Sequence, residues 1–381
     1  MKIKIGSPVV GEDFYGREEE LQRAVAMIQG NNLMLAAPRR VGKTSFAHRL
    51  MDTLGASGWN TIFIDLEKIT GIAHFFRIFH DELVRLPEVS LSDKLKSKAR
   101  KWLEDIELSA SAMSVAASFK VRERYHDDFT TLAELLNTLE RPTLIVFDEL
   151  TVLLESLLLQ DDGEREVRTF LNQFRALRTS TAGRCCWMIC SSVGVRNFTT
   201  QHNMSDTIND VADFELGAYS DAEARSFIAM LARDSGINLS PATADYLLRK
   251  IGWNIPFFIQ LLLSRLSQGD APVAQGDVDA AYAGLLMTGS FDTWYERLNK
   301  EYGNRTATAK VALRFLCVHV DGMPRADIQN YLQANFPSLE NDDLGLLLRA
   351  LMTDGYLAKD GENYRFRSPL LRDYWKMTYC S

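Results

Sequence analysis

Long apolar runs are scarce in this sequence of 381 residues, and no stretch reaches the roughly 18 apolar residues that a membrane-spanning helix needs. No long apolar stretch follows the first residues either, so no targeting segment is predicted. Repeats of about 20–50 residues, which are typical of solenoids and propellers, are also absent. We therefore expect a soluble, cytoplasmic protein that does not associate with a membrane.

Cysteine and an excess of positive charge are lacking as well. Five cysteines do not suffice for a disulfide framework in a chain of this length. Cys185, Cys186 and Cys190 lie in one apolar run without a histidine at metal-ligand spacing, so we expect buried thiols rather than a metal site. The formal net charge of −7 disfavours a non-specific nucleic-acid binder, although it allows a local basic patch.

What the sequence does contain, over residues 1–218, is an alternation of short apolar runs and amphipathic stretches. Such an alternation is typical of a parallel sheet with helices on both faces, so the predicted fold class is α/β. Ligands of these sheets bind at the carboxyl ends of the strands. The predicted strands are residues 32–37, 61–66, 142–147, 184–191 and 212–216, and the predicted helices are 41–54, 71–86 and 164–180.

Residues 87–127 interrupt this alternation and are interpreted as an insertion in the first domain. Residues 93–104 carry five cationic side chains. Residues 106–121 are rich in Ser, Ala and Val and alternate loosely, which predicts a hairpin. The segment is either a solvated helix with an edge hairpin or a contact surface for a partner or nucleic acid.

From Asp221 onward the pattern becomes helical. Four helices without intervening strands are predicted at 222–234, 241–251, 256–266 and 277–287, which suggests a helical lid domain over residues 219–290. Residues 291–381 follow with three predicted helices at 307–318, 325–334 and 341–354, and with a hairpin that turns through Asp360-Gly361. Three helices and a hairpin are typical of a winged-helix domain.

One motif carries chemistry of its own. The segment Ala37-Pro38-Arg39-Arg40-Val41-Gly42-Lys43-Thr44 fits the phosphate-binding loop, with Ala37 at the first glycine position. A predicted strand precedes it and a helix follows, so backbone N–H groups would converge on the phosphates. Gly42 would allow a tight turn at which a side chain would clash. The Lys43 ammonium would neutralise the β- and γ-phosphates, and the Thr44 hydroxyl would coordinate Mg²⁺.

A phosphate loop needs acids from a second strand. The apolar residues 144–147 are followed by Asp148 and Glu149. Asp148 would hold Mg²⁺ through water, and Glu149 would orient and deprotonate the attacking water, which favours hydrolysis over nucleotide holding. The next strand ends at Ser191. This serine is either a further catalytic residue, near the γ-phosphate or the lytic water, or a cap of the strand end.

Four motifs in chain order together resemble one family. They are the "GRE" box at Gly16-Arg17-Glu18, the phosphate loop at 38–45, a lid motif with a proline at Pro256, and the segment 364–375. In this combination the chain resembles STAND-class AAA+ P-loop ATPases of the archaeal-type ATPase branch. The resemblance implies a P-loop NTPase (AAA+/STAND) parallel-sheet core in residues 1–218, an α-helical lid in 219–290 and a winged-helix domain in 291–381.

The resemblance also implies an ATP and Mg²⁺ site. Tyr15, Gly16 and Arg17 would line the adenine side, and Pro256 would close over the base from the lid. The loop residues that would bind the nucleotide are Pro38, Arg39, Arg40, Val41, Gly42, Lys43, Thr44 and Ser45. The GRE box and the lid motif are also compatible with a purely structural interpretation. Residues 16–18 can form a turn that enters a helix, and Pro256 can begin a helix.

The chain departs from the family in one respect. Many AAA+ proteins carry an arginine just before the last strand that reaches into a neighbouring subunit's site, but residues 205–210 contain no arginine. Arg196 is the nearest earlier candidate, and Arg39 and Arg40 would either serve or face solvent. Because an arginine finger accelerates hydrolysis by several orders of magnitude, we expect slow basal hydrolysis or activation by a partner.

Three functions are compatible with these features. The first is a STAND-type switch that signals its nucleotide state to a separately encoded protein partner, as in prokaryotic defence or signalling systems, with homo-oligomerisation allowed. The second is a DNA-binding AAA+ ATPase that resembles origin-recognition or transposition regulators. The predicted recognition helix 341–354 offers only Arg349 among three aspartates, so DNA is not favoured. The third is a nucleotide-binding scaffold without turnover.

Overall fold

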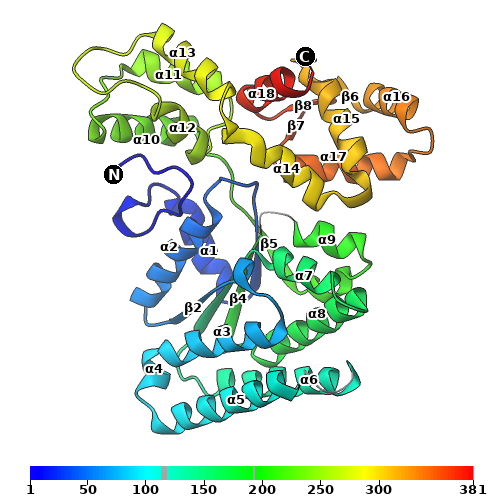
Figure 1. Cartoon of the computed structure of the whole chain (residues 1–381). Helices are drawn as coiled ribbons and strands as arrows, with labels where there is room; N and C mark the ends of the chain where they lie inside the picture. Colours follow the sequence, from blue (N-terminus) through cyan, green and yellow to red (C-terminus); the bar gives the residue numbers. More distant parts are fainter. Residues whose placement is uncertain (113–117, 192–193, 381) are drawn as a thin grey trace. The chain divides into compact units, whose positions relative to one another are not determined.

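The structure is a computed structural model that describes residues 1–112, 118–191 and 194–380. The chain divides into two compact units (Figure 1). The first, called the sheet unit, consists of Arg17–Ala36 and Lys43–Leu216. The second, called the C-terminal unit, consists of Met1–Gly16, Ala37–Gly42 and Gly217–Ser381.

The sheet unit is built on a five-stranded, fully parallel sheet with the order β2-β3-β4-β1-β5. The five predicted strands are confirmed, with ends that differ by one residue at most. They are β1 (Asn32–Ala36), β2 (Asn60–Asp65), β3 (Thr143–Asp148), β4 (Cys185–Ser191) and β5 (Val211–Glu215). Strand β4 separates β1 from β3, so the strand before the phosphate loop and the strand before the acids are not direct neighbours.

Helices cover both faces of this sheet. Alternate strand residues such as Ile145 and Phe147 join a buried apolar cluster. That cluster includes side chains of α3 (Ile72–Arg85), α7 (Leu150–Leu158) and α8 (Gly163–Ser180). The intervening residues of β3 are buried outside that cluster, as the two-residue period of a strand requires. The helices α1 (Glu18–Ile28) and α2 (Lys43–Ala56) contact the strands and contribute buried residues outside the cluster. The predicted α/β sandwich is therefore confirmed.

The insertion is helical, and the hairpin predicted for residues 106–121 is wrong. Its helices are α4 (Pro87–Ser90), α5 (Asp93–Ala112) and α6 (Ser118–Asn137). Residues 113–117 lie outside the described part of the chain. Ala99, Trp102 and Ile106 are buried three and four residues apart, and the ring of Trp102 lies 5.9 Å from that of Phe76. This helical spacing of large apolar residues outweighs the loose alternation of small ones.

After Gly217 the C-terminal unit contains four helices in succession, at the places where four were predicted. They are α10 (Asp221–Asp234), α11 (Pro241–Ile251), α12 (Pro256–Leu263) and α13 (Gln275–Leu286). Ser220 and Glu223 form a capping box at the start of α10, and Ser240 caps α11 ahead of Pro241. Short polar signals of this kind explain why the starts of α10 and α11 can be read from the sequence.

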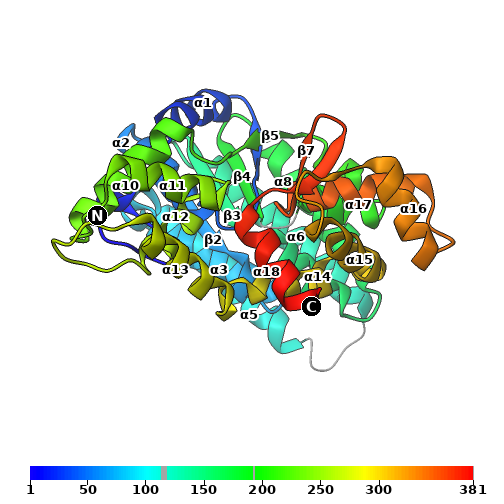
Figure 2. The same cartoon turned by 90° about the horizontal axis from the view of Figure 1, so that it is seen from above.

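The remainder of this unit combines helices with a small antiparallel sheet of order β6-β8-β7. The predicted hairpin is present, although its turn falls at Gly361-Glu362, one residue later than predicted. The elements are α14 (Asp292–Glu301), α15 (Thr306–Cys317), β6 (Met323–Pro324), α16 (Arg325–Asn335), α17 (Asn341–Thr353), β7 (Leu357–Asp360), β8 (Asn363–Phe366) and α18 (Pro369–Tyr379). Figures 1 and 2 both show α18 beside α15.

None of the helices in residues 1–112, 118–191 and 194–380 combines the length and the apolar character that crossing a membrane requires.

Candidate functional site

The predicted phosphate loop occupies residues 37–42, directly after β1 and before α2. Two of its residues have left-handed backbone angles, with φ of 70° at Arg40 and 102° at Gly42. Such turns bring backbone N–H groups together and are common where a loop binds an anion. A Cβ added to Gly42 would meet no protein atom within 4 Å. The backbone angle, and not the expected clash within the protein, therefore requires glycine here.

Lys43, Thr44 and Asp148 lie together in the sheet unit. Lys43 begins α2 and is only 7% exposed, as is Asp148 at the end of β3. The Thr44 Oγ1 atom donates a hydrogen bond to Asp148 Oδ2 over 2.7 Å. The structure thus brings the predicted Mg²⁺ ligand of the loop and the predicted acid into direct contact.

The surroundings of Asp148 favour a bound cation. Burial raises the pKa of its carboxyl to about 6, and the nearby charges of Glu149 and Asp65 act in the same direction. The hydrogen bond from Thr44 and the charge of Lys43 oppose this rise only in part. A buried carboxylate among other carboxylates is stabilised by a divalent cation, for which oxygen ligands are the preferred donors. The donor set therefore fits Mg²⁺.

Asp65 is a residue of this site that the sequence pattern missed. It ends β2 and stands opposite Asp148 in the parallel register of β2 and β3. Its carboxylate accepts the backbone N–H of Glu67 and pairs with Lys68 at 2.8 Å. The available signal was an acid at the end of a predicted strand, but the sequence does not reveal that β2 lies next to β3.

Glu149 holds an unusual backbone conformation just before α7. Its φ of 56° and ψ of 46° lie in the left-handed region, which costs a residue other than glycine about 1 kcal/mol or more. Its backbone N–H donates a hydrogen bond to the carbonyl of Cys190 on β4 over 2.9 Å, which helps to hold this geometry. Backbone strain concentrates at functional sites, so this observation agrees with the predicted role of Glu149.

Ser191 stands at the end of β4, in register with Ala36 of β1. It is buried, and its hydroxyl lies 2.9 Å from the Thr151 hydroxyl in the first turn of α7. The serine therefore links the central strand to the helix that follows Glu149. Its predicted catalytic contact with the γ-phosphate or the lytic water stays a prediction.

The predicted adenine-side residues lie in different surroundings. In the C-terminal unit, the ring of Tyr15 packs 5.1 Å from that of Phe227, and the Tyr219 hydroxyl donates to the Tyr15 carbonyl over 3.0 Å. Gly16 follows with φ of 66°. In the sheet unit, Arg17 precedes α1, is buried and forms an ion pair with Glu20 at 3.0 Å. Helix α1 begins at Glu18, as the structural interpretation of this motif predicts.

Pro256 and the loop residues Pro38 and Arg40 share the C-terminal unit. Pro256 is the first residue of α12, as its structural interpretation predicted. The Arg40 guanidinium lies 4.1 Å from the centre of the Phe257 ring, and burial lowers the pKa of Arg40. Arg40 therefore stacks on its own chain rather than facing solvent. The other predicted loop residues are Val41, which is buried, and Arg39 and Ser45, which are half-buried.

Pro38 packs against the turn before β7, again within the C-terminal unit. A Cβ added to Gly355 would lie 2.8 Å from Pro38 Cβ and 2.7 Å from Trp253 Cη2. The φ of Gly355 is 86°, so both its backbone and its surroundings require glycine. Phosphate-loop residues thus touch α12 and the segment between α17 and β7.

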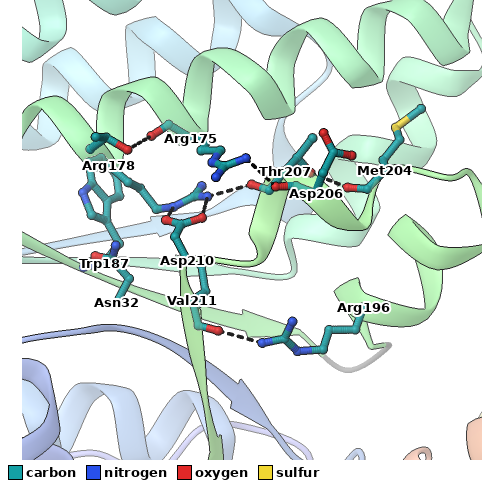
Figure 3. A network of polar contacts seen from close by, with 11 residues as sticks. Asn32, Arg175, Arg178, Trp187, Arg196, Met204, Asp206, Thr207, Asp210 and Val211 are labelled. Atoms are coloured by element: carbon teal, nitrogen blue, oxygen red, sulfur yellow. Dashed lines mark hydrogen bonds and ion pairs between the residues drawn. The ribbon is translucent and has the colours of Figure 1, made fainter.

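Residues 205–210, which contain no arginine, accept hydrogen bonds from two arginines of α8. Arg178 of α8 is fully buried and donates to both carboxylate oxygens of Asp210, over 2.7 and 2.9 Å, and to the Thr207 carbonyl over 2.8 Å (Figure 3). Arg175 of the same helix donates to the Asp206 carbonyl over 2.7 Å. These bonds fix residues 206–210 directly ahead of β5.

Arg196, the earlier finger candidate, is also engaged within the sheet unit. It projects from α9 (Val195–Gln201) and donates to Asp213 over 2.7 Å. It also donates to the Val211 carbonyl over 2.6 Å (Figure 3). Both partners belong to β5, so this arginine ties α9 to the edge strand of the sheet.

The parallel sheet, the phosphate loop after β1 and the acid pair after β3 define a P-loop NTPase fold of the AAA+ type. Residues 13–185 match the family model of the AAA ATPase domain. No curated protein sequence matches the chain.

Two solved structures share the fold over nearly the whole chain. The Walker-type ATPase of Pyrococcus abyssi superposes with a TM-score of 0.65 at 15% sequence identity, covering 99% of this chain and 100% of that one. The ORC2 protein of Aeropyrum pernix, solved in ADPNP–ADP complexes, has a TM-score of 0.52 at 11% identity, covering 99% of this chain and 98% of that one. At these identities the likeness shows the fold alone.

Proposed function

We propose that this protein binds ATP with Mg²⁺ and hydrolyses it slowly, as a molecular switch that passes its nucleotide state to a partner protein. The observation that carries the proposal is the cluster of Lys43, Thr44, Asp148 and Glu149 at the carboxyl ends of β1 and β3, joined by the 2.7 Å hydrogen bond from Thr44 to Asp148. The match to the AAA ATPase domain model and the Walker-type ATPase of similar fold support it.

The cluster suggests a division of roles. The backbone of residues 37–42 and the Lys43 ammonium would bind the phosphates, while Thr44 and Asp148 would hold Mg²⁺. The metal would neutralise charge that develops on the phosphoryl oxygens. Glu149 would accept a proton from the attacking water, and Ser191 would contact the γ-phosphate or that water. Tyr15, Gly16, Arg17 and Pro256 would contact the base.

The contacts of three arginines near β5 support slow hydrolysis. Arg178 and Arg175 bind the segment before β5, and Arg196 binds β5 itself. Each of them is therefore engaged in hydrogen bonds within its own chain. Residues 205–210 contribute no arginine of their own. An arginine finger would then come from a partner or from a second copy of the chain, and hydrolysis without it would be slow.

The switch proposal rests on the contacts of the loop in the C-terminal unit. Pro38 touches Gly355, and Arg40 stacks on Phe257, so a change of loop conformation on nucleotide binding would be felt by α12 and by the turn before β7. The helices and hairpin from α15 to β8 follow the element order of a winged helix, and α10–α13 are suited to act as the lid.

The contacts of the hairpin arginines argue against DNA as the partner. Arg365 pairs with Asp360 at 3.1 Å. Arg367 donates to two backbone carbonyls, lies 5.3 Å over the Trp253 ring and has a pKa that burial lowers. These cations already have partners in the protein, whereas DNA binding requires cations that face the phosphates. A protein partner therefore fits this unit better than DNA.

The test is single-turnover hydrolysis by wild type and by Glu149→Gln, with ATP affinity measured in parallel. We expect Glu149→Gln to bind ATP normally and to hydrolyse it about 100-fold more slowly, as loss of a general base predicts. Glu134→Gln, on the exposed face of α6, is the matched control and should behave like wild type. Equal background rates in wild type and Glu149→Gln would contradict hydrolysis and leave a nucleotide-binding scaffold.

A further inference from the structure

Two cysteines that are far apart in the sequence meet in the C-terminal unit. Cys317 is the last residue of α15, and Cys380 follows α18, 63 positions later. Their Sγ atoms lie 2.9 Å apart. We propose that Cys317 and Cys380 form a reversible disulfide that fastens the end of α18 to α15. The proposal uses only this unit and does not depend on nucleotide binding.

The local geometry brings the two thiols side by side. Both thiols point to the same acceptor, the carbonyl of Arg314 one turn earlier in α15, over 3.2 Å from Cys317 and 3.7 Å from Cys380. A disulfide bond is about 2.05 Å long, so the sulfur atoms need to approach by less than about 1 Å. A shift of that size is within reach of side-chain rotation at the end of a helix.

The two thiols differ in solvent exposure, and we therefore expect them to react with an oxidant in a fixed order. Cys380 is exposed, whereas Cys317 is 1% exposed. Burial, and to a smaller extent the neighbouring Cys380 thiol, raise the pKa of Cys317 to about 12 against the charge of Lys376. The exposed thiol is therefore the one that meets an oxidant first, and the buried one resolves the intermediate.

The oxidant would be a small-molecule disulfide such as oxidised glutathione. The Cys380 thiolate attacks one sulfur of that disulfide, forms a mixed disulfide and releases one glutathione thiolate. The Cys317 thiolate then attacks the Cys380 sulfur and releases the second glutathione. Two protein thiols are oxidised to one disulfide, one small-molecule disulfide is reduced to two thiols, and the two protons that leave the protein thiols end on the two glutathione thiols. Excess reduced glutathione reverses the sequence.

The loop closed by the bond, residues 317–380, would contain all three strands of the small antiparallel sheet. Helix α18 contacts α11 and α13 as well as α15. The Tyr282 hydroxyl of α13 donates to Asp373 of α18 over 2.8 Å, and Ser368, before α18, donates to the Ile251 carbonyl at the end of α11 over 2.8 Å. Helix α18 thus connects helices α11 and α13 with the small antiparallel sheet. The disulfide would prevent the C-terminal end of α18 from separating from α15.

The other three cysteines provide an internal reference. Cys185, Cys186 and Cys190 all lie on β4 in the sheet unit, and burial raises the pKa of each. They should stay reduced under conditions in which Cys317 and Cys380 react. A specific reaction therefore consumes two of the five thiols, and a non-specific one consumes more or fewer.

The experiment equilibrates the full chain with reduced or oxidised glutathione, traps free thiols with a maleimide under denaturing conditions and maps them by mass spectrometry. We expect the oxidised wild type to lose two thiols and to yield a linked peptide pair that contains Cys317 and Cys380. Cys186→Ser, a half-buried thiol outside the pair, should lose the same two. Cys380→Ser, an exposed and structurally mild change, should form no internal link.

A second measurement tests the fastening. The oxidised wild type should melt at least about 5 °C higher than the reduced form, because the link closes a long loop, and Cys380→Ser should show no such difference. Five free thiols after oxidation, a persistent glutathione adduct on Cys380, or a dimer linked through Cys380 would each overturn the disulfide. Equal melting temperatures of a correctly linked and a reduced chain would overturn its role as a fastener.

Discussion

The hydroxyl of Thr44, in the first turn of α2, donates a hydrogen bond to the carboxylate of Asp148 at the end of β3 over 2.7 Å. The two residues are 104 positions apart, and the sheet alone brings them together. Thr44 as a direct ligand and Asp148 through water would together hold Mg²⁺. Substitutions of Thr44 and Asp148 therefore test the proposed Mg²⁺ site most directly.

Removing the hydroxyl should weaken Mg²⁺-dependent ATP binding. We expect Thr44→Val, which keeps the shape of the side chain, to lower the affinity for ATP in Mg²⁺ by about tenfold or more, since one ligand and one buried hydrogen bond are lost. Thr44→Ser retains the hydroxyl and serves as the control. The measurement is a titration with and without EDTA. A Thr44→Val protein with wild-type affinity would show that Thr44 is no metal ligand.

Neutralising Asp148 should stabilise the nucleotide-free protein and abolish its metal binding. Its pKa is raised to about 6, so the folded state holds the proton more tightly than the unfolded chain does. Asp148 therefore stabilises the fold only at low pH, and this contribution, about 3 kcal/mol, is lost as the pH rises through about 6. We expect Asp148→Asn to raise the melting temperature at pH 7.5 and to change it much less at pH 4.5.

The control for this prediction is Asp127→Asn, an exposed aspartate on α6, which should change the melting temperature little. Wild-type binding of Mg²⁺-ATP should weaken as the pH falls below about 6, because the carboxyl becomes protonated, whereas the Asn variant should show weak binding at every pH. A destabilised Asp148→Asn protein at neutral pH would contradict the raised pKa.

The strands and the phosphate loop could be predicted because their signals are local. Each strand is a short apolar run, and Gly42-Lys43-Thr44 follows one of them directly. Helix α7 was missed because its sequence LTVLLESLL is apolar on nearly every side, so it has no helical period. The α5–α6 segment was predicted as a hairpin in part because small residues at 109–117 carry little periodic information.

Long-range pairings could not be predicted. The sequence places Asp65 at the end of a strand, but only the order β2-β3-β4 puts it beside Asp148. Similarly, Arg178 and Asp210 lie 32 positions apart on elements whose relative placement depends on the complete sheet. Stacking of Arg40 on Phe257 also depends on tertiary structure, and the sequence left that arginine equally suited to solvent.

The buried Arg178 should be essential to the stability of the sheet unit. Its truncation removes two hydrogen bonds to Asp210 and one to the Thr207 carbonyl, so we expect Arg178→Ala to lower the free energy of unfolding by about 3 kcal/mol. Arg175→Ala, on the same helix, removes one exposed bond to a backbone carbonyl and should cost about 1 kcal/mol or less. Urea unfolding compares the two. Similar small losses in both would show that the pair contributes little.

The close approach of Gly355 to Pro38 should influence ATP binding. A methyl group at Gly355 would clash with Pro38 of the phosphate loop and with Trp253, in addition to the strain of a φ of 86°. Gly361 provides the matched control, because its φ of 56° is also left-handed but a Cβ there would meet no atom within 4 Å. Both alanine variants should lose about 1 kcal/mol of stability through backbone strain.

Only Gly355→Ala should also shift the loop, and we expect its ATP affinity to fall by about tenfold or more while that of Gly361→Ala stays unchanged. Isothermal titration of the two folded variants, checked by circular dichroism, measures this difference. Equal ATP affinities in both variants would show that the contact between Pro38 and Gly355 does not influence the phosphate loop. It would also remove the structural support for coupling between the nucleotide and the C-terminal unit.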